Sequence, residues 1–419
     1  MKMEAMGSMW AITGGGVVVA LVLAWVLVTG GLIFLWKRLA VTRVWAVAAR
    51  LAGIVVSNLL VVVLAFVLLN NQYEFYTSWS ELRDDLTSGG FFAADEAKAV
   101  PVDEVLKTGA DAATTLATGR VISPLPPVVG VPEGTRAGRD QTYTVVGKRS
   151  RVTTSVSVVL PPGYRDNAAV YPVLVAIHGL PGTPETMLRE LSIGEAVDAE
   201  VAAGKLAQPI LVVPKTTTAT SRDSECTDVP GTNMETFLAV DLPNWVQKSF
   251  RVTADRSAWA SMGLSEGGYC SAMLATLHPQ RFGSAMAFGG YFRPIWPGGG
   301  NGPYPPTDLR SKRYDLVRMA QRRPPPSAIW AQSPKTDALS YDSTMEFFNA
   351  VKPPTAMEAV ILAYGGHRAS VWRPFVPVAL SWLGQVAPGF RPSSPPPPTL
   401  PRWALLGPPA PTPAPAPAA

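Results

Sequence analysis

The stretch that decides the fold is WASMGLSEGGYC, residues 259–270. It contains a Gly-x-Ser-x-Gly motif with Ser265 at its centre. An apolar run precedes the motif, and residues 267–279 continue with helical spacing and stop at a proline. A serine on a sharp turn from strand to helix has an exposed hydroxyl, and glycines beside it relieve crowding. This context predicts that Ser265 is a nucleophile, whereas the five letters alone could arise by chance.

Short apolar runs alternate with helix-like stretches on both sides of the motif. The runs occupy residues 153–162, 171–179, 208–215, 256–263, 283–290, 327–333 and 359–366. Two of them are continuously apolar, as expected for strands that are buried on both faces. Alternating strands and helices predict a mostly parallel sheet with helices on both faces. Together with the turn at Ser265, this predicts an α/β-hydrolase fold over residues 139–390.

Two apolar segments precede this region. Residues 9–36 carry no charge and residues 51–69 form a second run, and each is about long enough to cross a membrane. The loop between them is basic and contains Lys37, Arg38, Arg43 and Arg50. Because short basic loops stay in the cytoplasm, the rest of the chain should be extracytoplasmic. We expect a multi-pass cell-membrane anchor over 1–72, with helices at about 9–36 and 46–69; a signal peptide or buried core helix is the alternative.

The regions outside the anchor and the predicted hydrolase domain show little pattern, and the composition argues against nucleic-acid binding and a zinc site. Residues 73–138 are weakly patterned and predict a short helical stalk followed by a linker. The Pro/Ala-rich residues 391–419 predict a disordered, polyproline-like tail. A net charge of +5 over 419 residues, without a Lys/Arg-rich stripe, argues against nucleic-acid binding. Two cysteines cannot build a four-ligand zinc site, so no metal is expected.

A catalytic serine needs a base, and in this fold the acid and then the histidine follow the nucleophile along the chain. The sequence has three histidines, His178, His278 and His367. The first precedes Ser265, and the second lies on the helix after the motif and should close that helix. His367, in the turn after the last apolar run, is therefore the predicted base, with an ordinary surface histidine as the alternative.

The acid should lie between the serine and the histidine. Asp337 follows the apolar run at 327–333 and is the predicted acid, with Asp342 as the runner-up. It would accept a hydrogen bond from the imidazole and hold its tautomer. Two backbone N–H groups must also bind the oxyanion.

We expect the two oxyanion donors to be Glu266, directly after the nucleophile, and Leu180, in the loop HGLPGTPE after an early strand. His178 should shape this loop rather than take part in catalysis. A simple Gly/Pro turn is the alternative interpretation of the loop. The predicted chemistry requires no metal or organic cofactor.

The cysteines Cys226 and Cys270 are the only two in the chain. In an oxidising compartment a single pair predicts a disulfide, with buried free thiols as the alternative. Such a bond would connect the polar loop around Cys226 to the helix that follows Ser265.

Four segments resemble the putative-esterase family of α/β-hydrolases, which includes S-formylglutathione hydrolases, feruloyl esterases and secreted mycolyltransferases. They are YPVLVAIHGLPG, ETFLAVDLPNWVQKSF, WASMGLSEGGYCSAMLATLHPQRFGSAMAFGG and GGHRASVWRPFVPVALSWL. The resemblance covers roughly residues 140–386. It implies Ser265, Asp337 and His367 as the triad, with Leu180 and Glu266 as oxyanion donors. Mycolyltransferases typically use glutamate as the triad acid and lack an anchor, so this chain departs from them.

These observations predict a membrane-anchored extracytoplasmic serine esterase that acts on an ester or acyl-lipid substrate. One alternative is an envelope acyltransferase, similar to mycolyltransferases, that moves an acyl group to a sugar or lipid alcohol. Both reactions pass through the same acyl-enzyme and differ in whether water or an alcohol attacks it. A non-catalytic envelope binding protein is the alternative from another class, and a complete triad in the expected order argues against it.

Overall fold

The computed structural model of the protein describes residues 11–39, 43–73, 75–87, 100–117, 139–164, 167, 169–217, 223–296, 304 and 308–392. The predicted Pro-rich tail lies outside these residues, apart from positions 391 and 392, as does much of the predicted linker. The chain forms two compact units that interleave along the sequence. The first contains residues up to Val105 together with Ser333–Asp342 and Val360–Pro374, and the second contains the remainder.

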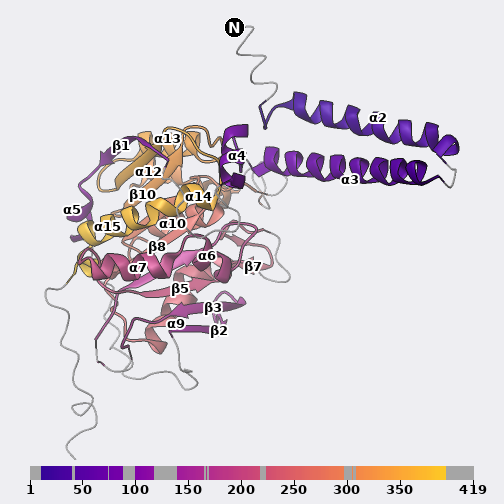
Figure 1. Cartoon of the computed structure of the whole chain (residues 1–419). Helices are drawn as coiled ribbons and strands as arrows, with labels where there is room; N and C mark the ends of the chain where they lie inside the picture. The colour runs from indigo at the N-terminus through magenta and orange to yellow at the C-terminus, as the bar shows by residue number, and fades with distance from the viewer. Residues whose placement is uncertain are drawn as a thin grey trace, which may run out of the picture. The chain divides into compact units, whose positions relative to one another are not determined.

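The first unit begins with two long helices, α2 (Gly15–Leu39) and α3 (Val44–Tyr73), which pack side by side (Figure 1). Both are long and apolar enough to cross a membrane. The Thr29 and Ser57 hydroxyls form a hydrogen bond of 3.0 Å between them. The predicted first span begins at residue 9, whereas α2 begins at Gly15. Residues 14–16 are glycines, which are poor helix formers.

A short helix, α4 (Trp79–Thr87), follows α3. Further along, β1 (Val102–Gly109) and α5 (Ala112–Ala117) lie in the range for which the sequence predicted only a stalk and linker. The side chains of β1 alternate between exposed and half-buried positions, and the strand lies at the edge of the sheet. An edge strand of this kind lacks the continuous apolar run that is typical of a buried strand, so β1 was not predicted from the sequence.

A sheet of nine strands has the order β1-β11-β10-β9-β8-β4-β5-β3-β2. The strands after β1 are β2 (Asp140–Val146), β3 (Thr153–Val159), β4 (Val173–Ile177), β5 (Ile210–Pro214), β8 (Trp259–Leu264), β9 (Ser284–Phe288), β10 (Ala328–Pro334) and β11 (Ala356–Leu362). Pairing from β5 through β4, β8 and β9 to β10 is parallel, and β3 pairs antiparallel with β2 and β5. The mostly parallel sheet expected from the sequence is confirmed.

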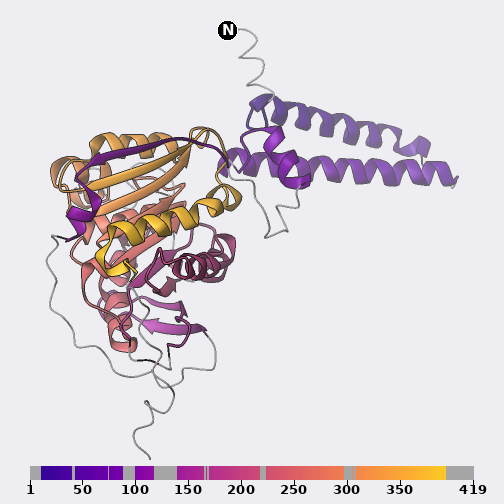
Figure 2. The same cartoon turned by 60° about the vertical axis from the view of Figure 1, so that its left-hand side comes forward.

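Helices pack on this sheet. Their bounds are α6 (Pro184–Glu190), α7 (Ile193–Ala202), α9 (Leu242–Ser249), α10 (Glu266–Leu277), α12 (Leu316–Arg322), α13 (Tyr341–Ala350) and α15 (Val376–Val386). The helix after the motif, α10, packs against β4, β8 and β9, and nearly all of its residues are buried. Helices α7 and α15 pack against each other (Figure 2). The β8–α10 junction therefore lies in the centre of the second unit, where both neighbouring strands support it.

Candidate active site

Ser265 occupies the turn between β8 and α10. Its φ of 56° and ψ of −124° are unusual for a residue with a side chain. The turn is held by its backbone: the Ser265 N–H donates to the Phe288 carbonyl at 2.9 Å, and the Ser265 carbonyl accepts from Gly268 N at 2.9 Å. The side chain is partly exposed although nearly all of α10 is buried. The predicted strand–turn–helix context of this serine is thus present.

Both glycines of the motif are required by close backbone approach. A Cβ on Gly263 would collide with the Gly267 carbonyl, and a Cβ on Gly267 would collide with the carbonyls of Ile177 and His178. Glu266 is the first residue of α10, so its N–H has no acceptor within the helix. This N–H lies at the positive end of the helix dipole, where negative charge is stabilised.

The loop after β4 lies directly against the serine. A Cβ placed on Gly179 would be 3.1 Å from the Ser265 Cβ, and Leu180 follows in the same loop. His178 stabilises the loop: its Nδ1 donates to the Gly179 carbonyl at 2.8 Å, and its Nε2 accepts from Thr216 N at 3.2 Å. Burial lowers the pKa of His178, which keeps the ring neutral. These contacts agree with a shaping role for His178.

The predicted acid and base are in contact. Asp337 is fully buried, and its Oδ2 accepts a hydrogen bond from His367 Nδ1 at 2.9 Å. The same carboxylate accepts from the Ser340 hydroxyl at 2.7 Å and from Leu339 N at 3.1 Å. Asp342, the runner-up, is exposed in the first turn of α13. The structure therefore places Asp337, and not Asp342, against the histidine.

Further contacts connect the loop of the acid to the loop of the histidine. The Thr336 hydroxyl donates to the Gly365 carbonyl at 2.8 Å and accepts from Gly365 N at 2.9 Å. The His367 ring packs edge-on against Trp372, with ring centres 4.8 Å apart. Since Asp337 binds Nδ1, the hydrogen bond fixes the tautomer in which Nε2 is the basic nitrogen of the neutral ring.

The site residues thus form two groups, one in each unit. The first unit holds Asp337 and His367 in contact, and the second unit holds Ser265 beside Glu266 and the loop of Leu180.

The remaining histidine, His278, has a structural partner. His278 ends α10, as expected, and its Nε2 lies 2.7 Å from Glu235 Oε1. Burial raises the pKa of Glu235, but hydrogen bonds from His278, Tyr314 and Arg313 outweigh it and bring the pKa down to about 2. Glu235 is thus an ionised, buried carboxylate that holds several elements together.

The predicted disulfide is present. Cys226 and Cys270 are bonded, with Cα atoms 5.6 Å apart, and both residues are completely buried. The bond attaches the segment around Cys226 to α10. Glu266 lies close to both sulfurs, but bonded sulfurs offer no thiolate to a metal ion.

An acidic cluster beside the serine was not predicted. The carboxyls of Asp223 and Glu266 share a hydrogen bond, and the Tyr291 hydroxyl donates to Glu225 at 2.8 Å. Burial is the main cause that raises the pKa of Glu225 to about 8, and burial likewise raises the pKa of Glu266 well above its usual value. Asp223 and Glu225 adjoin Cys226 in the sequence, and Glu266 lies four residues before Cys270, so the predicted disulfide was the signal that could have located the cluster.

Comparison with known proteins agrees with this geometry. A family model described as "Putative esterase" matches residues 147–374, which is more than half of the chain. The chain belongs to the putative esterase family. An uncharacterized protein of Corynebacterium glutamicum is 32% identical over 136 residues, 32% of each chain. The Mycobacterium tuberculosis protein named Esterase Rv1288 is 29% identical over 143 residues, covering 32% of this chain and 28% of that protein.

The chain spans about a third or less of the length of the curated relatives it matches. Among solved structures, a ferulic acid esterase aligns with a TM-score of 0.50 and 22% identity, over 59% of this chain and 98% of that chain. An S-formylglutathione hydrolase from Agrobacterium tumefaciens aligns with a TM-score of 0.50 and 17% identity, over 62% and 100%. These similarities establish the α/β-hydrolase fold.

Proposed function

We propose that the protein is a membrane-anchored serine esterase with Ser265 as nucleophile, His367 as general base and Asp337 as the orienting acid. The observation that carries this proposal is the buried hydrogen bond between Asp337 and His367, in a family member whose serine occupies a strand-to-helix turn. A buried aspartate that binds Nδ1 stabilises the imidazolium formed when Nε2 takes a proton.

In the acylation step, Ser265 Oγ attacks the ester carbonyl carbon while its proton passes to His367 Nε2. The carbonyl oxygen becomes an oxyanion that accepts hydrogen bonds from the N–H groups of Leu180 and Glu266, each worth about 3 kcal/mol. The tetrahedral intermediate then expels the alcohol, which receives the proton from His367. Ser265 is left as an acyl ester.

In the second step, water attacks the acyl-enzyme and gives its proton to His367, and Ser265 departs with that proton as the acid is released. An alcohol can replace water in this step, and the product is then a new ester. Hydrolysis and acyl transfer thus use the same residues, and the nucleophile of the second step distinguishes them.

The anchor and its orientation belong to the same proposal. Support comes from the lengths of α2 and α3 and from the basic loop between them, which favours a cytoplasmic turn and an extracytoplasmic hydrolase. The disulfide between Cys226 and Cys270 agrees with an oxidising compartment.

The proposal is tested with the full-length protein in detergent, using a fluorophosphonate probe and p-nitrophenyl butyrate. Ser265→Ala should abolish labelling and lower kcat by at least about 10⁴-fold. Ser271→Ala is the matched control, because it removes a nearby serine hydroxyl, from within α10. Labelling that persists in Ser265→Ala would refute the assignment. Adding glycerol or a sugar and quantifying new esters distinguishes a transferase from a hydrolase.

A further inference from the structure

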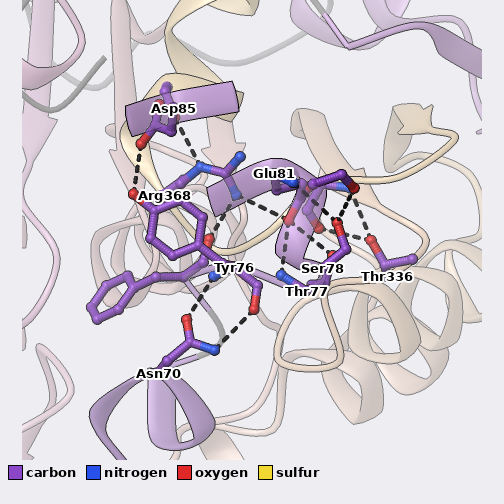
Figure 3. A network of polar contacts seen from close by, with 12 residues as sticks. Asn70, Tyr76, Thr77, Ser78, Glu81, Asp85, Thr336 and Arg368 are labelled. Atoms are coloured by element: carbon purple, nitrogen blue, oxygen red, sulfur yellow. Dashed lines mark hydrogen bonds and ion pairs between the residues drawn. The ribbon is translucent and has the colours of Figure 1, made fainter. Parts of the chain in front are cut away.

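The residues on both sides of His367 contact a short segment that follows α3. We call residues 75–85, which include most of α4, the juxtamembrane segment. Arg368 Nη1 donates to the Phe75 carbonyl at 2.6 Å and lies 3.4 Å from Glu81 Oε2 (Figure 3). Its guanidinium carbon is 4.7 Å from the centre of the Tyr76 ring. All of these residues belong to the first unit.

The ion pair between Arg368 and Glu81 is largely screened from solvent. The side chain of Arg368 is 16% exposed and that of Glu81 is 9% exposed. A buried charge that loses its partner is costly, so the guanidinium and the carboxylate hold each other in place. The cation also packs on an aromatic face, which favours the same position of the side chain.

On the other side of His367, Gly366 lies close to the Phe75 carbonyl, which also accepts the hydrogen bond from Arg368. A Cβ on Gly366 would collide with the oxygen of Phe75. The histidine loop and the juxtamembrane segment are therefore in contact through their backbones as well as through the side chain of Arg368.

The juxtamembrane segment has its own supporting contacts. Asn70, a fully buried residue near the end of α3, donates from Nδ2 to the Tyr76 carbonyl at 2.9 Å and accepts from Tyr76 N at 2.8 Å. The Tyr76 hydroxyl donates to Asp85 at 2.6 Å. Glu81 accepts from Thr77 N at 2.8 Å. A continuous set of contacts thus connects the end of α3 to Arg368, as Figure 3 shows.

We propose that the juxtamembrane segment is a positioning element for the catalytic histidine and that it acts through Arg368. This inference rests on the proposed function of His367. Asp337 orients the imidazole ring, and the juxtamembrane segment fixes the backbone on either side of it. Small displacements of a catalytic group cost large factors in rate, so the loop must be held from more than one direction. The chain that leaves the anchor would then complete the active site.

The test uses the full-length protein in detergent and compares Arg368→Gln, Glu81→Gln and the double variant with the parent. We expect kcat to fall about tenfold or more in each single variant, while KM changes less than about threefold. The double variant should be hardly worse than Arg368→Gln, because Arg368→Gln already removes the ion pair that Glu81→Gln disrupts. Arg368→Lys, which keeps the charge, should recover part of kcat.

Arg139→Gln is the matched control, because it breaks a two-bond arginine–aspartate pair in the other unit, at 2.6 and 2.8 Å from Asp198. It should leave kcat unchanged. If Arg368→Gln does not fold, the kcat of the isosteric variant Glu81→Gln tests the positioning role instead. Values of kcat within twofold of the parent, additive losses, or losses that Arg139→Gln reproduces would overturn the inference. The Ser265→Ala variant tests the proposed function separately. If the parent is active and the Arg368 and Glu81 variants keep its kcat, only the positioning role is rejected.

Discussion

The serine side and the histidine side of the site are built in different ways. The turn at Ser265 is fixed by backbone contacts, with Gly263 and Gly267 pressed against neighbouring carbonyl groups. The loop of His367 is also in close backbone contact, at Gly366, but polar side chains hold it in addition, namely Asp337 from another part of the first unit and Arg368 from the loop itself. A turn that is held by close backbone contacts requires small residues at fixed positions. A loop that is held by side-chain contacts can be built from many different sequences.

The difference has a consequence for mutation. At the serine turn a single added methyl group deforms the backbone, so stability and activity should fail together. At the histidine loop an isosteric change removes one polar contact and leaves the packing intact, so activity should fail alone.

The largest effect is expected on the histidine side. Asp337→Asn keeps the size of the side chain but supports the wrong tautomer of His367, and kcat should fall about 10⁴-fold. The measurement is kcat for p-nitrophenyl butyrate, together with the thermal midpoint, which should change little. Asp342→Asn is the control and should retain full activity. An Asp337→Asn variant with at least a tenth of the parent kcat would show that Asp337 is not the acid.

A smaller effect, on stability, is expected on the serine side. Gly267→Ala places a Cβ against the Ile177 and His178 carbonyls, and we expect a loss of about 3 kcal/mol or more. The thermal midpoint should therefore fall by several degrees and activity should fall with it. Gly194→Ala on α7 is the matched control, since its Cβ would meet no atom within 4 Å. An unchanged midpoint in Gly267→Ala would contradict the backbone account.

The third effect concerns the acidic cluster beside the serine and depends on pH. The pKa of Glu225 is about 8 in the folded protein against an ordinary value of 4.5, so the folded state holds a proton that the unfolded chain releases. Stability should therefore decline as the pH rises from about 4.5 to about 8. Glu225→Gln removes this decline, and its advantage in thermal midpoint over the parent should grow from pH 5 to pH 8.

The control for this experiment is Glu195→Gln, which changes an exposed glutamate on α7. Its midpoint should follow that of the parent at every pH. A constant difference between Glu225→Gln and the parent across the range would show that Glu225 does not carry the extra proton.

Sequence reasoning succeeded where structure depends on local pattern. Continuous apolar runs predicted the buried strands, and the glycines around Ser265 predicted the turn. The predicted acid Asp337 and the predicted base His367 lie in hydrogen-bond contact. Two cysteines in one chain were enough to predict the bond between Cys226 and Cys270.

Sequence reasoning failed where the structure depends on contacts between residues that are far apart in the chain. The edge strand β1 has only half-buried alternate positions, so its sequence resembles a linker. Arg368 and Phe75 are separated by 293 residues, and the contact uses a backbone carbonyl that any residue supplies. No periodicity or motif marks such a contact. The cluster of Asp223 and Glu225 was missed for a different reason. Acids in a polar loop usually face solvent, and their nearness to Cys226 was not used.

Reduction of the disulfide between Cys226 and Cys270 reports on local unfolding of the protein. Both sulfurs lie in residues without solvent exposure, so a reducing agent meets them only when α10 and the segment around Cys226 separate. The bond spans 44 residues that include Ser265, and its closure removes about 4 kcal/mol of loop entropy from the unfolded chain. The rate at which thiols appear in excess reductant therefore measures unfolding around Ser265, and it can be followed without any substrate.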